Sequence, residues 1–351
     1  MTTESTQAGG IRGMRRRQVA TTKLVETSFL PGHEESMPLI IRPAVENVDL
    51  AEWISANHDE LNSYFDKYGA IVFKGFGLKG APDFESAAAA VSPELFAEYG
   101  DLPQESTTER IYHSTPYPED KTILFHNESS HLPQWPIRQF FYCVIPSAEG
   151  GATPLLDCRK SYEALDPELR KEFEEKGLMY VRNFAEGIDV PWQTFFHTDE
   201  KAEVEKMCAD AGMTAEWTAN GLRVKQNQPS PAVAVHPRTG EKLFFNQIQL
   251  HHVSCLDEET RSALSQLFAE EDMPRNVYFG DGTPIPDEVV DRIGEMYEEL
   301  CVEPPWEAGD MIALDNMLVA HARRPFKGER KILVAMAEMV NVSDLEPLAA
   351  A

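Results

Sequence analysis

Short, nearly continuous apolar runs recur along the chain, and the segments between them place apolar residues at helical spacing. The runs contain the β-branched and aromatic residues typical of buried strands, and they cover residues 70–76, 139–145, 178–184, 311–314 and 332–336. Helical spacing predicts helices over residues 47–68, 82–90, 162–176, 257–271 and 287–300. The segments 233–236 and 242–246 flank Arg238-Thr239-Gly240 and predict a hairpin.

The order of these elements indicates the fold class. Strands are scattered along the chain, helices lie between them, and there is no regular βαβ alternation. This pattern predicts a mainly β fold with peripheral helices, a largely antiparallel double-stranded β-helix or jelly roll. Residues 1–38 are polar and charged and predict a flexible tail with a short ordered piece around residues 23–29. Residues 39–345 then form a single domain, with helical or loop insertions at about 185–225 and 255–305.

Composition limits the possible partners of the protein and its possible cellular location. The 351 residues carry a formal net charge of −26, which excludes nucleic acid and anionic membrane surfaces as partners because their phosphates would be repelled. The five cysteines show no C-x-x-C spacing, so they predict reduced thiols rather than a disulfide framework or a zinc ribbon. The N-terminal basic residues are followed by no apolar segment, and no apolar run approaches the length of a membrane span. We therefore expect a cytoplasmic protein.

The candidate chemistry begins at His126 and Glu128. Residues i and i+2 of a strand, or of its immediate extension, project to the same face, so these two side chains can reach one ion while Asn127 points away. A second imidazole, His321, follows a buried apolar strand and the turn at Asp315-Asn316. Two imidazoles and one carboxylate form the facial ligand set of Fe(II) oxygenases, which leaves coordination positions open.

Three arginines follow His321 and suggest a co-substrate. A guanidinium can hold the distal carboxylate of a dicarboxylate as a planar fork while the other end of that molecule binds the metal. Arg330 opens the next apolar strand nine residues after His321, and Arg323 and Arg324 lie closer to it. The adjacent pair His251-His252 is a weaker metal candidate, because neighbouring residues on a strand point to opposite faces.

Two other classes of protein fit part of this pattern. A zinc hydrolase can use two histidines and one glutamate to activate water, but the helical H-E-x-x-H motif is absent and such an enzyme has no need of Arg330. A non-catalytic jelly-roll binding or regulatory protein would contain His126 and Glu128 as ordinary polar strand residues. That hypothesis predicts no metal-dependent turnover and full tolerance of His321→Ala.

Taken together, these motifs resemble those of the TauD/TfdA-like Fe(II)/2-oxoglutarate dioxygenases over roughly residues 40–342. The segments that carry the resemblance are His126-x-Glu128, residues 150–157, Asp315-Asn316, and His321-x-Arg323-x-x-Phe326-x-x-x-Arg330. The His-Asn-Glu-x-Ser form at residues 126–130, together with residues 112–118, is similar to the SyrP-like branch found in natural-product pathways.

The resemblance implies a clavaminate synthase-like jelly roll and specific site roles. His126, Glu128 and His321 would hold Fe(II), Arg330 would bind the C5 carboxylate of 2-oxoglutarate, and Thr153 would hydrogen-bond the same co-substrate, with O2 as the oxidant. Two features depart from the family pattern. The separation of 193 positions from Glu128 to His321 implies sizeable insertions, and Arg330 follows its histidine more closely than in many relatives, so Arg323 and Arg324 compete for its role.

The same resemblance implies hydroxylation of an unactivated C–H bond of an amino acid, either free or carried as a thioester on a peptidyl carrier protein. Related halogenases replace the metal-binding carboxylate by a small residue, so the presence of Glu128 favours hydroxylation; desaturation and cyclisation stay open as alternatives. The candidate substrate residues are Ser114, Thr115, Asn127 and Arg324.

Overall fold

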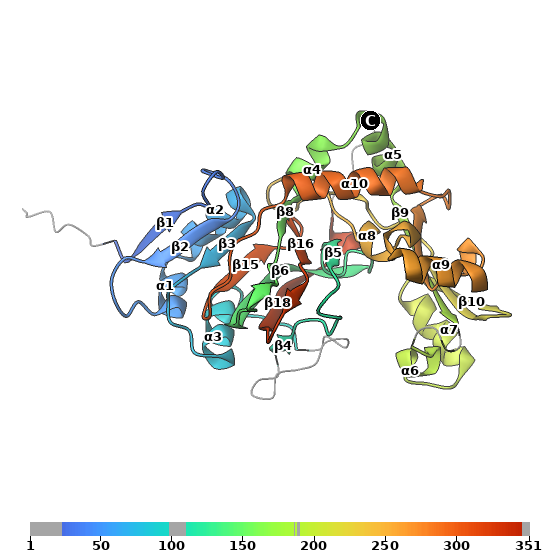
Figure 1. The fold of residues 1–351 in the computed structure, drawn as a ribbon, viewed down its shortest axis with the longest axis horizontal. Coiled ribbons are helices and arrows are strands. Elements are labelled where there is room, and N and C mark those ends of the chain that lie inside the picture. Colours follow the sequence, from blue (N-terminus) through green and yellow to red (C-terminus); the bar gives the residue numbers. More distant parts are fainter. Residues whose placement is uncertain (1–22, 98–109, 186, 188–189, 346–351) are drawn as a thin grey trace, which may run out of the picture.

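The computed structural model describes residues 23–345 except 98–109, 186 and 188–189. Helices and strands are about equally represented among these residues, so the fold is mixed α and β rather than mainly β as predicted. Figure 1 shows an elongated molecule with the N-terminal strands and helices at one end, the long central strands in the middle, and a side lobe at the other end.

The largest sheet forms the centre of the molecule. Its strands, in spatial order, are β1 (Val25–Ser28), β2 (Leu39–Pro43), β3 (Ala70–Phe73), β15 (Met311–Asp315), β6 (Gln134–Ile145), β18 (Lys331–Asn341) and β4 (Tyr112–His113). Neighbours pair antiparallel except β2 and β3, which are parallel. Phe140 and Tyr142 of β6 pack into one hydrophobic cluster, and Phe141 and Cys143 pack into another on the opposite face. Both faces are therefore buried, which explains why this strand is a continuous apolar run.

Three N-terminal helices cover the face of this sheet that bears Phe140 and Tyr142. They are α1 (Leu50–Ala56), α2 (His58–Tyr68) and α3 (Ala81–Val91). The single helix predicted over residues 47–68 is interrupted at Asn57, whose side-chain amide donates to the carbonyl of Trp53 at 2.7 Å. The prediction that the helix stops at Gly69 is confirmed. This glycine has φ 72°, and a Cβ there would come within 2.6 Å of Val319 Cγ2, so the position requires glycine.

A smaller sheet lies on the face of the large sheet opposite the three N-terminal helices. Its strands are β5 (Ile123–His126), β16 (Val319–Arg323) and β8 (Leu155–Asp157), with β16 in the middle, and β7 (Glu149–Gly150) pairs with β17 (Phe326–Lys327) nearby. Helices α4 (Cys158–Ala164) and α10 (Asp287–Leu300) lie over β8 and β16 (Figure 1). The amphipathic helix predicted at residues 287–300 is confirmed, with Val290 and Ile293 buried.

The helix predicted over residues 162–176 is instead two helices. α4 ends at Ala164, and α5 (Pro167–Lys176) begins after Asp166, whose carboxylate accepts from the amides of Glu168 and Leu169. An Asp N-cap followed by Pro at the first helical position is a strong start signal, and it outweighed the continuous helical spacing. The predicted hairpin is confirmed as β12 (Val233–Val235) and β13 (Lys242–Phe244).

The two segments interpreted as separate insertions combine into one lobe. Its sheet has the order β10 (Met213–Thr218), β11 (Gly221–Gln226), β9 (Leu178–Ala185) and β14 (Arg275–Phe279). The helices of this region are α6 (Trp192–Phe196), α7 (Lys201–Asp210), α8 (Ile248–His251) and α9 (Glu258–Leu267), with short 3-10 turns at Val253–Cys255 and Glu270–Asp272. Outside this region, another 3-10 turn follows β18 at Val342–Asp344. Because β14 pairs with β9, the later insertion completes the sheet that the earlier one began.

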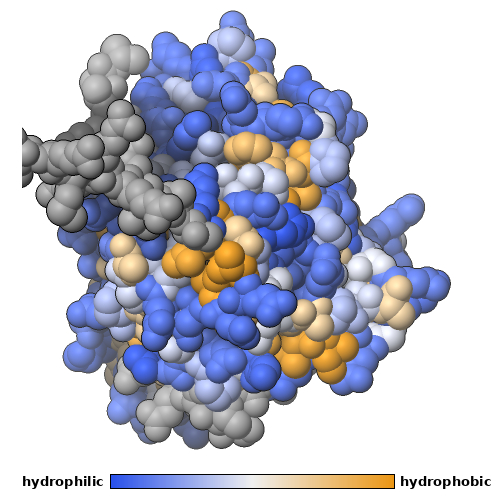
Figure 2. Space-filling model, turned by 90° about the vertical axis from the view of Figure 1, so that its left-hand side faces the viewer, coloured by the Kyte–Doolittle hydropathy of each residue, from blue (hydrophilic) through white to orange (hydrophobic). Residues whose placement is uncertain are grey.

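Ordered structure begins earlier than the predicted tail boundary at residue 38. β1 pairs with β2 along its whole length, in agreement with the short ordered piece expected around residues 23–29. The rest of the predicted tail, residues 1–22, lies outside the described residues. The end of the molecule at which β1 and β2 lie is mostly hydrophilic, with apolar side chains confined to separate patches (Figure 2). Within the described ranges, no helix is both long and apolar enough to cross a membrane.

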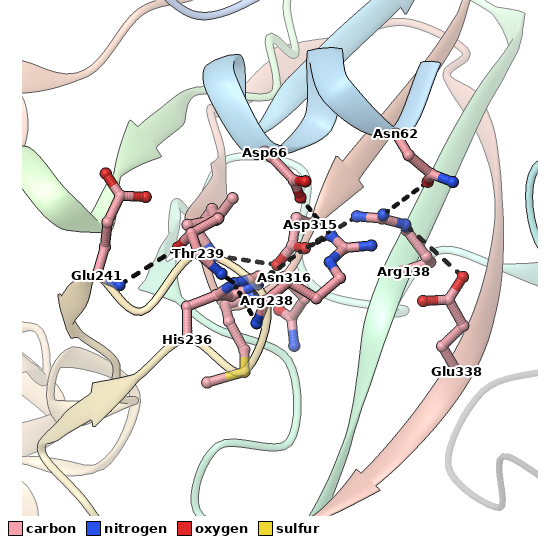
Figure 3. Close-up of polar contacts among 12 residues, drawn as sticks. Asn62, Asp66, Arg138, His236, Arg238, Thr239, Glu241, Asp315, Asn316 and Glu338 are labelled. Carbon is pink, nitrogen blue, oxygen red and sulfur yellow. Dashed lines mark hydrogen bonds and ion pairs between the residues drawn. The ribbon is translucent and has the colours of Figure 1, made fainter. Parts of the chain in front are cut away.

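A buried carboxylate joins the central sheet to the hairpin. Asp315, at the end of β15, is completely buried, and its Oδ2 lies 2.9 Å from Arg138 Nη1, 2.9 Å from Arg238 Nη2 and 3.2 Å from His236 Nε2 (Figure 3). Its Oδ1 accepts from the backbone amides of Met317 and Leu318. Burial opposes ionisation of Asp315, but the bond from His236 and the charge of Arg138 outweigh it and lower the pKa to about 2.

We expect Asp315→Asn to lower the free energy of unfolding by about 3–5 kcal/mol, because Arg138 would stay buried without its nearest counter-charge. The pH dependence follows from the lowered pKa. The carboxylate stabilises the fold above its unfolded-state pKa of about 3.9, and this contribution, roughly 2 kcal/mol, is lost as the pH falls toward 2. Urea titrations between pH 2 and 6 would show a shallower acid dependence in the variant.

Asp199→Asn, at an exposed position, is the matched control and should leave both the stability and its pH profile unchanged. An Asp315→Asn variant as stable as the wild-type protein would contradict the role given to this carboxylate.

Candidate metal centre

Two imidazoles meet across the small sheet. His126, the last residue of β5, is the direct antiparallel partner of His321 on β16, and paired residues of an antiparallel ladder place their side chains on the same face. The two ring centroids lie 4.2 Å apart, and Phe141 of the large sheet packs on His321 at 5.0 Å. Strand pairing alone therefore brings together two histidines that are distant in the sequence.

Glu128 completes the group from the turn that follows β5. One ligand atom from each of His126, Glu128 and His321 lies within 4.8 Å of the others, and among the described residues no other cluster of this kind occurs. Gln139 Nε2 lies 3.4 Å from Glu128 Oε2. The arrangement provides two nitrogen donors and one carboxylate oxygen, the donor set suited to Fe(II) with open positions.

Asn316 fixes the backbone of Glu128. Its side-chain oxygen accepts the amide of Glu128 at 2.7 Å, and its side-chain nitrogen donates to the carbonyls of Glu128 at 3.0 Å and of Pro136 at 2.9 Å. Asn316 is fully buried, directly after Asp315 at the turn between β15 and β16. The turn that leads to His321 thus also positions Glu128.

The hydrogen bond of His126 and the burial of His321 suit metal binding. Nδ1 of His126 donates to the carbonyl of Leu124 at 2.8 Å, so Nε2 is the ring nitrogen that can face a metal. Burial, and then the neighbouring His126, lower the pKa of His321 well below its usual value, so its ring is neutral at pH 7. Nδ1 of His321 is buried and has no hydrogen-bond partner among the described residues.

A partly buried cation and a hydroxyl group lie in the same pocket. Arg330 and Thr153 line it together with the three candidate ligands. The guanidinium of Arg330 donates to the carbonyl of Gly151 at 3.0 Å and to Thr153 Oγ1 at 3.4 Å, and it has no carboxylate partner within the described parts of the chain. Burial lowers the pKa of Arg330 to about 10, so it stays charged at neutral pH.

Thr153 is arranged to donate a hydrogen bond to a ligand. Its hydroxyl oxygen accepts from Trp306 Nε1 at 3.1 Å as well as from Arg330. A hydroxyl has two acceptor positions and one donor, so these two bonds leave its proton for another group. A Cβ at Gly151, where φ is +70°, would lie 3.1 Å from Arg330 Nε and 2.2 Å from Ser147 Oγ, so the glycine leaves room for the arginine.

The other two arginines named in the sequence have different contacts. Arg323 also lines the pocket, but its guanidinium donates to the carbonyls of Tyr117, Pro118 and Lys121, at 3.1, 2.5 and 2.8 Å. It therefore holds the loop that precedes β5. The guanidinium of Arg324 forms ion pairs with Glu298 and Glu303. Arg324 is not among the residues that line the pocket.

Of the three remaining predicted substrate residues, two line the metal pocket and one does not. Ser114 and Thr115 line the metal pocket. Asn127 does not; its side chain donates to the carbonyl of Asn316 at 2.6 Å and accepts from the amide of Asn246 at 3.2 Å. These internal bonds use the amide group, so the structure gives no support to a substrate role for Asn127.

One feature of the region went unnoticed in the sequence, and another was assigned to the wrong type of element. Gln139 is a buried polar residue within the apolar run of β6, and a polar residue in such a run is the signal that could have revealed it. His251 and His252, interpreted as strand residues, instead lie at the end of α8, where each imidazole hydrogen-bonds a backbone carbonyl, of Gln247 and Ile285 respectively.

The fold and this site together define an oxygenase that uses Fe(II) and 2-oxoglutarate. Residues 34–336 match the family model described as "Taurine catabolism dioxygenase TauD, TfdA family", so the chain belongs to that family. It is accordingly an enzyme, a dioxygenase with Fe(II) and 2-oxoglutarate as its cofactor and co-substrate, and it acts on a small molecule.

Named relatives and a solved structure agree with this assignment. The chain is 32% identical over 302 residues to the dapdiamide synthesis protein DdaC of Enterobacter agglomerans, covering 86% of this chain and 91% of that protein. It is 30% identical to the clavaminate synthase-like protein At3g21360 of Arabidopsis thaliana, covering 91% and 100%. A taurine dioxygenase from Burkholderia xenovorans has a similar fold, with a TM-score of 0.53 at 15% identity and 92% coverage of each chain. The two facing sheets accordingly form the double-stranded β-helix of this family.

We expect Asn316→Ala to weaken Fe(II) binding about 10- to 100-fold, because residues that orient metal ligands have effects of this size. An anaerobic Fe(II) titration, run well below the melting temperature of the variant, measures the affinity. Asn220→Ala, at an exposed turn, is the control. Unchanged affinity in a folded Asn316→Ala protein would show that Glu128 needs no such support.

Proposed function

We propose that this chain is a hydroxylase in which His126, Glu128 and His321 hold Fe(II), and Arg330 and Thr153 bind 2-oxoglutarate. The observation that carries the proposal is one pocket in which three converging ligand atoms lie with a charged arginine that has no acidic partner in the described part of the chain. Arg330 supplies a fork for the distal carboxylate, and Thr153 has a proton to donate. A zinc hydrolase would leave both groups without a role.

The protein residues have distinct tasks in this proposal. When bound, Fe(II) and 2-oxoglutarate activate O2 to oxidise an unactivated C–H bond. Arg330 and Thr153 orient the co-substrate, and Phe141 and the buried strands behind His321 exclude water from that side of the pocket. Retention of the Glu128 carboxylate favours hydroxylation over halogenation, and desaturation or cyclisation are the alternative outcomes of the same chemistry.

For the substrate we propose an amino acid or an amino acid derivative, either free or attached to a peptidyl carrier protein, in a natural-product pathway. The names of the relatives support this, since one is a dapdiamide synthesis protein and another is clavaminate synthase-like. We also propose the SyrP-like branch within the family, a single catalytic domain over residues 39–345, and a cytoplasmic location. Ser114 and Thr115 are the substrate candidates that line the pocket.

The first test is an anaerobic titration of the metal-free protein with Fe(II) and 2-oxoglutarate, observing the weak visible charge-transfer band of the chelate. We expect His321→Ala to abolish the band. We expect Arg330→Gln to raise the 2-oxoglutarate concentration for half-saturation by about 10- to 150-fold, which corresponds to a charged hydrogen bond of roughly 1.5–3 kcal/mol.

Lys327, like Arg330, lies between β16 and β18, but it is exposed. Lys327→Gln is therefore the matched control and should leave the titration unchanged. A band of full intensity in His321→Ala would contradict the ligand assignment. An unaltered co-substrate requirement in Arg330→Gln would contradict the subsite.

A further inference from the structure

A second cavity, of about 470 Å³, lies in the side lobe. Its walls come from β9, β11 and β14, from α6, α7 and α8, and from the turn that follows Glu128. The volume is within the range of about 300–1,000 Å³ found for small-molecule sites. The function proposed above assigns no occupant to this cavity.

Much of the cavity wall is apolar and aromatic. Phe184, Phe195, Phe196 and Met207 contribute to it, and Phe195 and Met207 are 39% and 46% exposed. The guanidinium of Arg182 lies 4.5 Å from the ring centroid of Phe184 and 4.4 Å from that of Phe195. A flat apolar or aromatic group in the cavity would therefore contact several rings beside a cation.

The charged residues of the lining are all cationic. Among the described residues, Arg182, Lys225 and Arg275 line the cavity and no acidic residue does, although the chain contains 58 Asp and Glu residues. Lys225 lies 3.6 Å from Glu216. Arg275 is exposed and has no ion-pair partner among the residues that the structure describes. In a strongly acidic chain, this concentration of positive charge favours an anion.

Strand register makes the charge arrangement more specific. Arg275 of β14 and Arg182 of β9 are direct cross-strand partners, and both side chains line the cavity. A carboxylate that reaches Arg275 would therefore lie beside two guanidinium groups.

One wall of the cavity belongs to the segment that carries the metal ligands. His131 lines the cavity three residues after Glu128, and Gln247, which also lines it, donates to the carbonyl of Asn127 at 2.9 Å. The rings of His131 and His251 lie 5.0 Å apart. Burial, with a contribution from Arg275, lowers the pKa of His131 to about 4, so His131 is neutral at pH 7 and the arginines and Lys225 remain the charged groups.

We propose that this cavity binds the non-reacting end of the substrate, an organic carboxylate with an apolar or aromatic body, through Arg275 and Arg182. The rings take the body and the two arginines take the carboxylate. The identification of the molecule as a substrate rests on the proposed function, whereas the binding preference itself does not.

The test compares 4-phenylbutyrate with 4-phenylbutan-1-ol, which share a skeleton and differ in charge. Calorimetric titrations use the full-length protein, anaerobically, with Fe(II) and saturating 2-oxoglutarate so that Arg330 is already engaged. We expect the carboxylate to bind at least 10-fold more tightly than the alcohol. Arg275→Gln should remove this preference by weakening the carboxylate alone, and Phe196→Ala should weaken both probes.

Arg292→Gln, an exposed cation on α10, is the matched control and should leave both affinities unchanged. Equal affinity for the two probes in the wild-type protein, or a carboxylate preference that survives Arg275→Gln, would overturn the proposal. So would a preference that is lost in Arg330→Gln instead, since the probe would then occupy the metal pocket.

The two proposals fail separately. A chelate band without Arg275-dependent binding would leave the oxygenase assignment standing and remove the cavity assignment. Arg275-dependent binding without a chelate band would do the reverse. Perturbation of the chelate band by 4-phenylbutyrate in the wild-type protein, and not in Arg275→Gln, would support a substrate-side role for the cavity.

Discussion

The ionised carboxylate of Asp315 is the constraint on which the rest of the structure depends. It is completely buried where β15 ends, and it is stable there because Arg138, Arg238 and His236 surround it. A buried charge with several partners specifies an arrangement more than it adds stability. Here it joins the central sheet to the β12–β13 hairpin. The next residue, Asn316, holds the backbone of Glu128, so the same turn sets both the packing of the sheets and the geometry of the metal ligands.

Charge is distributed unevenly at the metal pocket and the lobe cavity of this acidic chain. The metal pocket contains Arg330 without a carboxylate partner among the described residues, and Glu128 is the only acidic residue that lines it. The charged residues that line the lobe cavity, within the described ranges, are all cations. The overall charge of −26 would repel a dianionic co-substrate at long range, so local positive potential at the pocket offsets that repulsion over short distances.

Much of this could be predicted from the sequence, because strongly patterned features depend on local chemistry. The buried strands, the amphipathic helix at residues 287–300 and the pairing of His126 with Glu128 all follow from periodicity. Contacts between distant segments could not be predicted in this way. The sheet that joins β14 to β9, the carbonyls that engage Arg323 and the internal bonds of Asn127 depend on which segments become neighbours. Two short-range signals also disagreed with each other. Helical spacing predicted one continuous helix, whereas the start signal at Asp166-Pro167 divides that segment into two helices.

The ladder that joins His126 to His321 connects strands that are 195 residues apart in the sequence. Closing a loop of this length costs chain entropy before any contact repays it, which makes such pairings a slow part of folding. While β16 is unpaired, β5 and its turn hold two of the three donors but no complete site. Metal binding therefore reports that folding has finished, and once bound, the ion acts as a cross-link that favours the folded state by mass action.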